Sequence, residues 1–99
     1  MARKKYDGVI EAVRYDRDGK INVVRTYLRH GAVWSDHIIM GRNVLVDKIN
    51  QGKRFAIGDR IENMGNEFDT RAAVHLVKGH VITEGQAAAR DMLAGLSVF

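Results

Sequence analysis

The fold is decided by residues 6–30, which read YDGVIEAVRYDRDGKINVVRTYLRH. Residues 6–15 are rich in β-branched and aromatic side chains, and a cluster of turn-forming residues follows them. Within that cluster, Asp18-Gly19 supplies the positive φ angles that a tight hairpin needs, and residues 21–30 then alternate between two faces. The stretch therefore predicts two antiparallel strands joined by a turn.

Three later segments also alternate between apolar and polar side chains. They are residues 32–40, 55–62 and 68–76, and Val81-Ile82 indicates a short additional strand. Runs of strands with few helices are typical of barrels and sandwiches rather than of parallel sheets. The residues predicted to be buried in such a fold include Trp34, Phe55, Ile57, Ile61 and Phe68.

A helical signal at residues 43–52 interrupts the strands. Asn43 can cap the free amides at its start, Leu45 and Ile49 lie one turn apart, and Gly52 suits a left-handed end. A helix between the third and fourth strands is the element order of OB-type barrels, whereas SH3-type barrels have only a brief helical turn later in the chain. The sequence thus predicts a mainly β fold, a small antiparallel barrel that is OB-like or SH3-like.

A second helix is predicted after Thr83, ending at Gly95 and followed by an apolar tail to residue 99. Thr83 and Gln86 have the spacing of a capping box, three alanines follow them, and large apolar residues then recur at helical spacing. We expect this apolar stripe to cover the barrel or to contact a second copy of the chain, because exposure forfeits about 1.5–3 kcal/mol for each large side chain. The residues predicted to form an oligomer interface are Ala88, Met92, Leu93, Leu96 and Phe99.

Length and composition indicate one globular domain over residues 1–99, with a basic arm at 1–5, a barrel at 6–83 and the helix and tail at 84–99. Apolar residues make up 45% of the chain and charged residues 28%, as in ordinary globular proteins. The absence of cysteine excludes disulfides and thiolate sites. No apolar run approaches the roughly 20 residues that cross a bilayer, so we expect a cytoplasmic protein without a membrane partner.

The basic residues are concentrated in residues 1–60, where 13 Lys and Arg accompany 7 Asp and Glu. One face of the second predicted strand places Tyr27 between Arg25 and Arg29. Two cations beside an aromatic ring can hold phosphates and stack a base. The residues predicted to bind single-stranded nucleic acid are Arg17, Lys20, Arg25, Tyr27, Arg29 and Trp34. The alternative is that Tyr27 packs on the barrel and the arginine head groups are simply solvated.

Signals for catalysis or metal binding are weak throughout the chain. The four histidines lack the short spacings of zinc sites, and Ser35, Asp36 and His37 are neighbours in a strand, so they point alternately to opposite faces. The sequence contains neither a Walker loop nor a dinucleotide-binding loop. We therefore expect a non-enzymatic binding module without metal or cofactor. The alternative is a homo-oligomeric structural or regulatory protein assembled through its C-terminal helix and edge strands.

Overall fold

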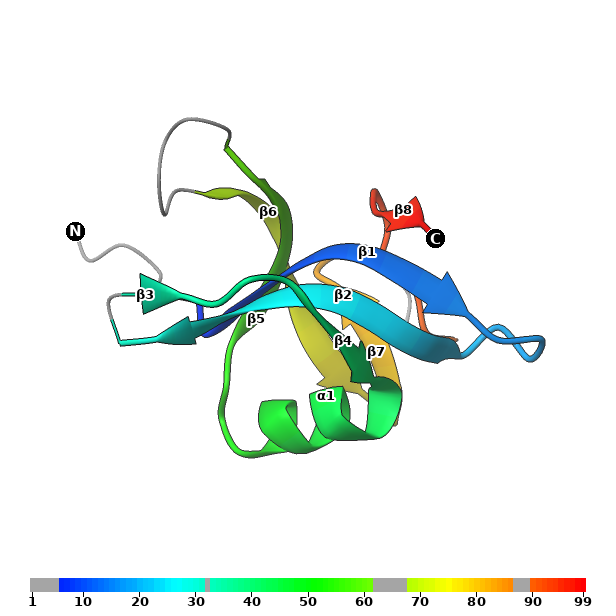
Figure 1. Ribbon diagram of the computed structural model, residues 1–99. Helices are drawn as coiled ribbons and strands as arrows, with labels where there is room; N and C mark the ends of the chain where they lie inside the picture. The colour runs from blue at the N-terminus through cyan, green and yellow to red at the C-terminus, as the bar shows by residue number, and fades with distance from the viewer. Residues whose placement is uncertain (1–5, 32, 62–67, 87–89) are drawn as a thin grey trace.

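The computed structural model describes residues 6–31, 33–61, 68–86 and 90–99 (Figure 1). It confirms a mainly β fold with one short helix. The sheet follows the order β3-β2-β1-β5-β6-β7, with β4 beside β2 and β8 beside β1. In chain order the elements are β1 (Gly8–Tyr15), β2 (Ile21–His30), β3 (Val33–Trp34), β4 (Ile38–Gly41), α1 (Arg42–Asn50), β5 (Phe55–Arg60), β6 (Phe68–Val77), β7 (His80–Thr83) and β8 (Ser97–Val98).

The sheet is mixed and does not close, so the prediction of an antiparallel barrel is wrong. β1 pairs antiparallel with β2 but parallel with both β5 and β8. The pairing of β1 with β2 is irregular between Ile10 and Ala12. β5 lies beside β1 up to Ile10, whereas β8 takes its place from Ala12 onward. No pairing joins β7 to β3 or β4 in the part of the chain that the structure describes.

The third predicted strand is divided into β3 and β4, which pair with different parts of β2. The division lies at Ser35, whose N–H donates to the carbonyl oxygen of Leu28 at 2.8 Å. The Ser35 hydroxyl accepts a hydrogen bond from the N–H of Leu28 at 3.0 Å. The Ser35 hydroxyl thus takes the place of a backbone acceptor in the pairing with β2. The regular pairing stops here for that reason and resumes at Ile38.

The helix predicted between the third and fourth strands is confirmed as α1. Leu45 is completely buried against the sheet, and Gly52 adopts the expected left-handed conformation at φ 90°. The capping prediction is wrong, since Gly41 precedes the helix and no side chain caps it. In Figure 1, α1 lies below the sheet, and no helix formed by the described residues covers the opposite face. Among the described residues no helix is long and apolar enough to cross a membrane.

The prediction of a helix between Thr83 and Gly95 is wrong wherever the structure describes this segment. Gly85 has a φ of 90°, which an α-helix does not accept, and Gln86 donates back to the carbonyl oxygen of Thr83 in a turn. Met92 instead exchanges backbone hydrogen bonds with β7, donating to Val81 and accepting from Thr83. These tertiary bonds satisfy the backbone that the local capping signal would have placed in a helix. The alanines at 87–89 lie outside the described residues.

The core lies between the sheet and α1. Of the five residues predicted to be buried, Phe55 and Ile57 are confirmed, with 1% and 2% of their surface exposed. Ile61 is exposed, while Trp34 and Phe68 are half-buried on the other face of the sheet. The core cluster consists of Ile10, Val13, Ile21, Val24, Met40, Leu45, Phe55, Ile57, Val74, Val81 and Leu93.

Candidate nucleic-acid interface

The face of β2 that carries the predicted binding residues is the face opposite to α1. Residues directly opposite each other in an antiparallel pair share a face. Val24 lies opposite Val13 and belongs to the core, whereas Arg25 lies opposite Ala12 and Tyr27 lies opposite Val9. We call this second side the outer face of the sheet. It is the side on which β8 is drawn in Figure 1.

Aromatic rings gather at one end of the outer face. Phe68 at the start of β6 connects two of them, because its ring centroid lies 5.0 Å from that of Tyr27 and 4.6 Å from that of Trp34. The ring of His37 meets Tyr27 edge-on at 5.9 Å. The guanidinium of Arg29 lies 5.7 Å from the centre of the Trp34 ring, within the range of a cation–π contact.

A second group of cations surrounds Phe99 further along the sheet. The guanidinium carbons of Arg14 and Arg25 lie 4.8 and 4.7 Å from the centre of its ring. The N–H of Phe99 donates to the carbonyl oxygen of Val13 at 3.0 Å, and Arg14 Nε donates to the main-chain oxygen of Phe99 at 2.9 Å. The pairing of β8 with β1 therefore holds this ring in place. Together the two groups form the outer-face cluster: Arg14, Arg25, Tyr27, Arg29, Trp34, His37, Phe68 and Phe99.

One carboxylate lies within the outer-face cluster. Glu11 Oε2 accepts a hydrogen bond from the Tyr27 hydroxyl at 3.2 Å. Its other oxygen lies 3.8 Å from Arg25 Nε and 3.9 Å from His37 Nδ1. Because Arg14 and Arg29 have no acidic side chain as a partner among the described residues, the side chains of the cluster carry an excess of positive charge.

The structure brings together four of the six residues predicted to bind nucleic acid, Arg25, Tyr27, Arg29 and Trp34. Tyr27 is only 7% exposed and packs against its neighbours, so Trp34 offers the more accessible ring. Arg17 and Lys20 are exposed in the β1–β2 turn, at the opposite end of β2 from β3 (Figure 1).

Sequence reasoning missed Arg14 and the placement of Phe68 and Phe99 in this cluster. Arg14 could have been found from the alternation of β1, which places it on the same face as Ala12. Phe99 could not, because it reaches Arg14 through a pairing that joins residues 85 positions apart.

Basic residues continue beyond Arg29 toward the end of α1. Arg29 and His30 of β2 line a depression of about 170 Å³ here. Lys48 of α1 and Lys53 of the loop after α1 line the same depression. Asp7 also lines it, and its carboxylate accepts a hydrogen bond from the N–H of Arg54. The cationic surface thus extends from the outer face around one end of the sheet.

The residues predicted to form an oligomer interface do not form a helical stripe. Leu93 is 2% exposed and belongs to the core, and Leu96 packs against that core. Met92 pairs with Ile82, and Phe99 lies in the outer-face cluster. Ala88 lies outside the described residues. The predicted interface assumed that these residues lie along one face of a helix, and the described residues do not form that helix.

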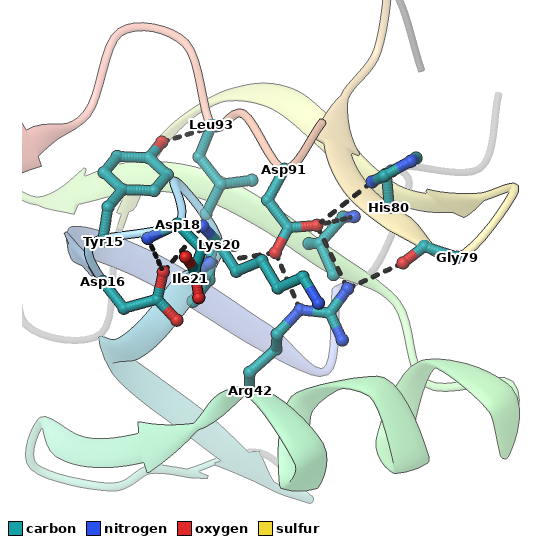
Figure 2. Close-up of polar contacts among 11 residues, drawn as sticks. Tyr15, Asp16, Asp18, Lys20, Ile21, Arg42, Gly79, His80, Asp91 and Leu93 are labelled. Carbon is teal, nitrogen blue, oxygen red and sulfur yellow. Dashed lines mark hydrogen bonds and ion pairs between the residues drawn. The ribbon is translucent and has the colours of Figure 1, made fainter. Parts of the chain in front are cut away.

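A buried ion pair, which no sequence signal indicated, joins the C-terminal segment to the sheet and to α1 (Figure 2). The side chain of Asp91 is completely buried, and its oxygens accept hydrogen bonds from Arg42 Nε at 2.7 Å and Arg42 Nη2 at 3.1 Å. They also accept the N–H groups of Ile21 and Val81, each at 2.9 Å. His80 Nδ1 lies 3.9 Å away.

The ionised form of Asp91 is favoured by these donors. Burial acts to raise the pKa of Asp91, but the hydrogen bonds from Arg42 and from the two backbone amides outweigh it and hold the pKa below its ordinary value. The same bond raises the pKa of Arg42. Because the carboxylate is both saturated with donors and closed to solvent, it serves as a structural clamp rather than as a reactive group.

No model of a known protein family matches the chain, and neither does any curated protein or solved structure. Within the described ranges, no group of three His, Asp or Glu side chains is arranged to hold a metal ion.

Proposed function

We propose that this protein is a non-enzymatic module that binds single-stranded nucleic acid on the outer face of its sheet. The observation that supports the proposal best is the row of arginines on aromatic rings, with Arg14 and Arg25 around Phe99 and Arg29 over Trp34. Arginines in such a row neutralise successive phosphates, and aromatic rings stack bases regardless of their identity. Trp34 is half-buried, so part of its ring remains accessible to a base.

The test is binding to a fluorescein-labelled oligothymidylate of about 12 nucleotides, measured by anisotropy over a range of salt concentrations. We expect the double variant Arg25→Ala, Arg29→Ala to bind at least about tenfold more weakly. Its plot of log affinity against log salt should become less steep by about 1.4, because each phosphate contact to a single strand contributes about 0.7 to the slope. Trp34 is the only tryptophan, so quenching of its fluorescence reports stacking directly.

The matched control is the double variant Lys78→Asn, Arg90→Ala, which removes two positive charges outside the outer-face cluster. Both side chains are exposed, and asparagine tolerates the positive φ of 52° at Lys78. This control should bind almost as well as the unaltered protein. The proposal is overturned if the unaltered protein shows no binding at about 100 µM protein and low salt, or if both double variants lose affinity equally.

A second candidate function is self-assembly through the edge of β4. One edge of β4 pairs with β2, and its other edge has no strand partner in the described ranges. Ile38 and Ile39 are 39% and 55% exposed there, and Val44 at the start of α1 is 49% exposed. An exposed apolar edge of this kind is a template for pairing with another strand. By contrast, the edge of β7 is already bonded to Met92.

Light scattering at about 100 µM protein tests this second candidate, since an interface of micromolar affinity would be occupied at that concentration. Assembly predicts a mass above that of the monomer. Ile39→Lys, which places a charge on the edge, should return the mass to that of one chain. A monomeric mass for the unaltered protein removes the candidate.

A further inference from the structure

A pocket of about 600 Å³ lies at the end of the sheet beyond the start of β5. Its apolar lining comes from Ile49 of α1, from Phe55, and from the last residues of β6, Ala73–Val77 apart from His75. Its polar lining is Tyr6, Lys53, Arg54 and His75, and none of the described residues that line it is acidic. A volume of this size is within the range of sites that hold ligands.

The pocket opens where β5 and β6 separate. The last pair between these strands is Phe55 with Val74, yet β6 continues to Val77 and is paired there only with β7. Ala73 accepts a hydrogen bond from Glu84 on the β7 side, so strand alternation directs the N–H and C=O of Leu76 to the opposite side, into the gap. Neither group has a partner there among the described residues.

The loop before β5 cannot fill this gap. The N–H of Lys53 donates to the carbonyl oxygen of Lys48, and the N–H of Arg54 donates to the Asp7 carboxylate. These bonds hold residues 52–54 toward α1 and β1. The side chains of Lys53 and Arg54 have no acidic partner among the described residues, and both line the pocket. The gap is therefore a wedge, closed at the Phe55–Val74 pair and positively charged beside that closed end.

We propose that this wedge binds the carboxyl end of an extended peptide from a partner protein. A wedge that is closed by a strand pair admits a chain only by its end. The side chains of Lys53 and Arg54 form no ion pair among the described residues, and the nearby Asp7 carboxylate is bonded to the N–H of Arg54, so the two cations favour the carboxylate over the amino end. Leu76 would supply main-chain hydrogen bonds, as in the addition of a strand to an exposed sheet edge, and the apolar lining would hold the last side chain. This site is separate from the outer-face cluster, so its failure and that of nucleic-acid binding are independent.

The test uses N-terminally fluorescein-labelled hexapeptides that end in Val, Leu, Ile or Phe with a free carboxyl group. We expect at least one to bind with a Kd of about 10–100 µM by anisotropy. Its C-terminal amide, and the same peptide lengthened by several residues beyond that end, should each bind at least about tenfold more weakly. These comparisons change only the peptide, so they do not depend on the folding of any variant.

A protein variant locates the site. Arg54→Glu should weaken the free-acid peptide about tenfold, whereas Arg90→Glu, which makes the same change of charge at an exposed position outside the pocket, should not. The proposal is overturned if no free-acid peptide binds at about 1 mM. It is equally overturned if the free-acid peptide and its amide bind alike. Displacement of the peptide by octanoate at a concentration equal to the Kd of the peptide would also overturn it, because the pocket would then be a site for small apolar carboxylates.

Discussion

The side chain of Asp91 connects segments that lie far apart in the chain. It joins the start of β2, the start of α1 and β7 to the C-terminal segment through Ile21, Arg42 and Val81. Such a carboxylate is stabilising only while all of its donors are present, because removing one partner leaves a buried polar group unpaired. Apart from the Asp91 side chain, the backbone of this segment is bonded to β7 through Met92, which donates to Val81 and accepts from Thr83.

Asp91→Asn is therefore expected to lower the free energy of unfolding by about 3–5 kcal/mol, the range for breaking a buried charge pair. The amide has one acceptor oxygen in place of two, and its NH₂ group would face the donors of Arg42. Urea denaturation at neutral pH measures the change. The matched control is Asp47→Asn on the exposed surface of α1, which should change stability by less than about 0.5 kcal/mol. Equal effects of the two substitutions would show that the buried pair is not a clamp.

At the scale of elements, the β5–β6 hairpin depends on a glycine. A Cβ added to Gly58 would lie 2.5 Å from the carbonyl oxygen of Asp69 and 3.1 Å from Thr70 Cα, both of which are backbone atoms. Gly58 also follows the irregularity in the pairing of β5 with β6. This close approach lets β6 begin at Phe68, where its ring reaches Tyr27 and Trp34 on the outer face.

Gly58→Ala should consequently separate the two strands and destabilise the protein by about 1–3 kcal/mol, the usual cost of overpacking. It should also alter the near-ultraviolet circular dichroism of Trp34, because Phe68 would shift against that ring. Gly41→Ser is the control, since an added Cβ there meets nothing within 4 Å and serine favours the position before a helix. We expect a change of only a few tenths of a kcal/mol for Gly41→Ser. A stable Gly58→Ala variant with unchanged dichroism would contradict this account.

The same elements show what local sequence patterns could predict. The hairpin of β1 and β2 and the helix α1 were predictable, because a turn sequence or a short apolar spacing determines each within a few residues. The pairing of β8 with β1 and of Met92 with β7 was not, since it depends on contacts between residues far apart in the chain. The capping signal at Thr83 was overridden for that reason, and its hydroxyl accepts the N–H of Ala94 instead.

The candidate interface was predictable to the same extent. Alternation along β2 placed Arg25, Tyr27 and Arg29 on one face, and the structure agrees. Which face lies inside, and that Tyr27 would be covered, depended on where α1 and the start of β6 pack. Those contacts are tertiary, so the alternation of residues along a strand does not predict them.

At the scale of the whole molecule, exposed positive charge extends from the outer-face cluster to Lys48 and Lys53, and one ion pair, Asp91 with Arg42, lies in the interior. The outer-face cluster and the basic path beside Lys48 and Lys53 face solvent, and their charges are screened by salt. The pair of Asp91 with Arg42 is shielded on the Asp91 side, which is fully buried. Salt should therefore weaken the proposed nucleic-acid binding strongly while changing the stability of the fold little.

The pH dependence of unfolding provides the final prediction. Because the pKa of Asp91 is held below its ordinary value in the folded protein, its ionised form contributes stability that is fully present above the ordinary carboxyl pKa of about 4. That contribution is lost as the pH falls through the lower pKa of the folded state, since both states then bind the proton. His80, 3.9 Å from the carboxylate, adds positive charge when protonated and does not reverse this direction.

Urea denaturation at several pH values between about 5 and 2 should thus show a falling free energy of unfolding for the unaltered protein. The fall should be smaller for Asp91→Asn, which has no proton to bind at this position, than for the exposed control Asp47→Asn. Because other carboxylates titrate in all three proteins, only the difference between the curves reports on Asp91. Parallel curves for the unaltered protein and Asp91→Asn would mean that the carboxylate has the same pKa in the folded and unfolded chains, and that the hydrogen bonds from Arg42, Ile21 and Val81 do no more than offset its burial.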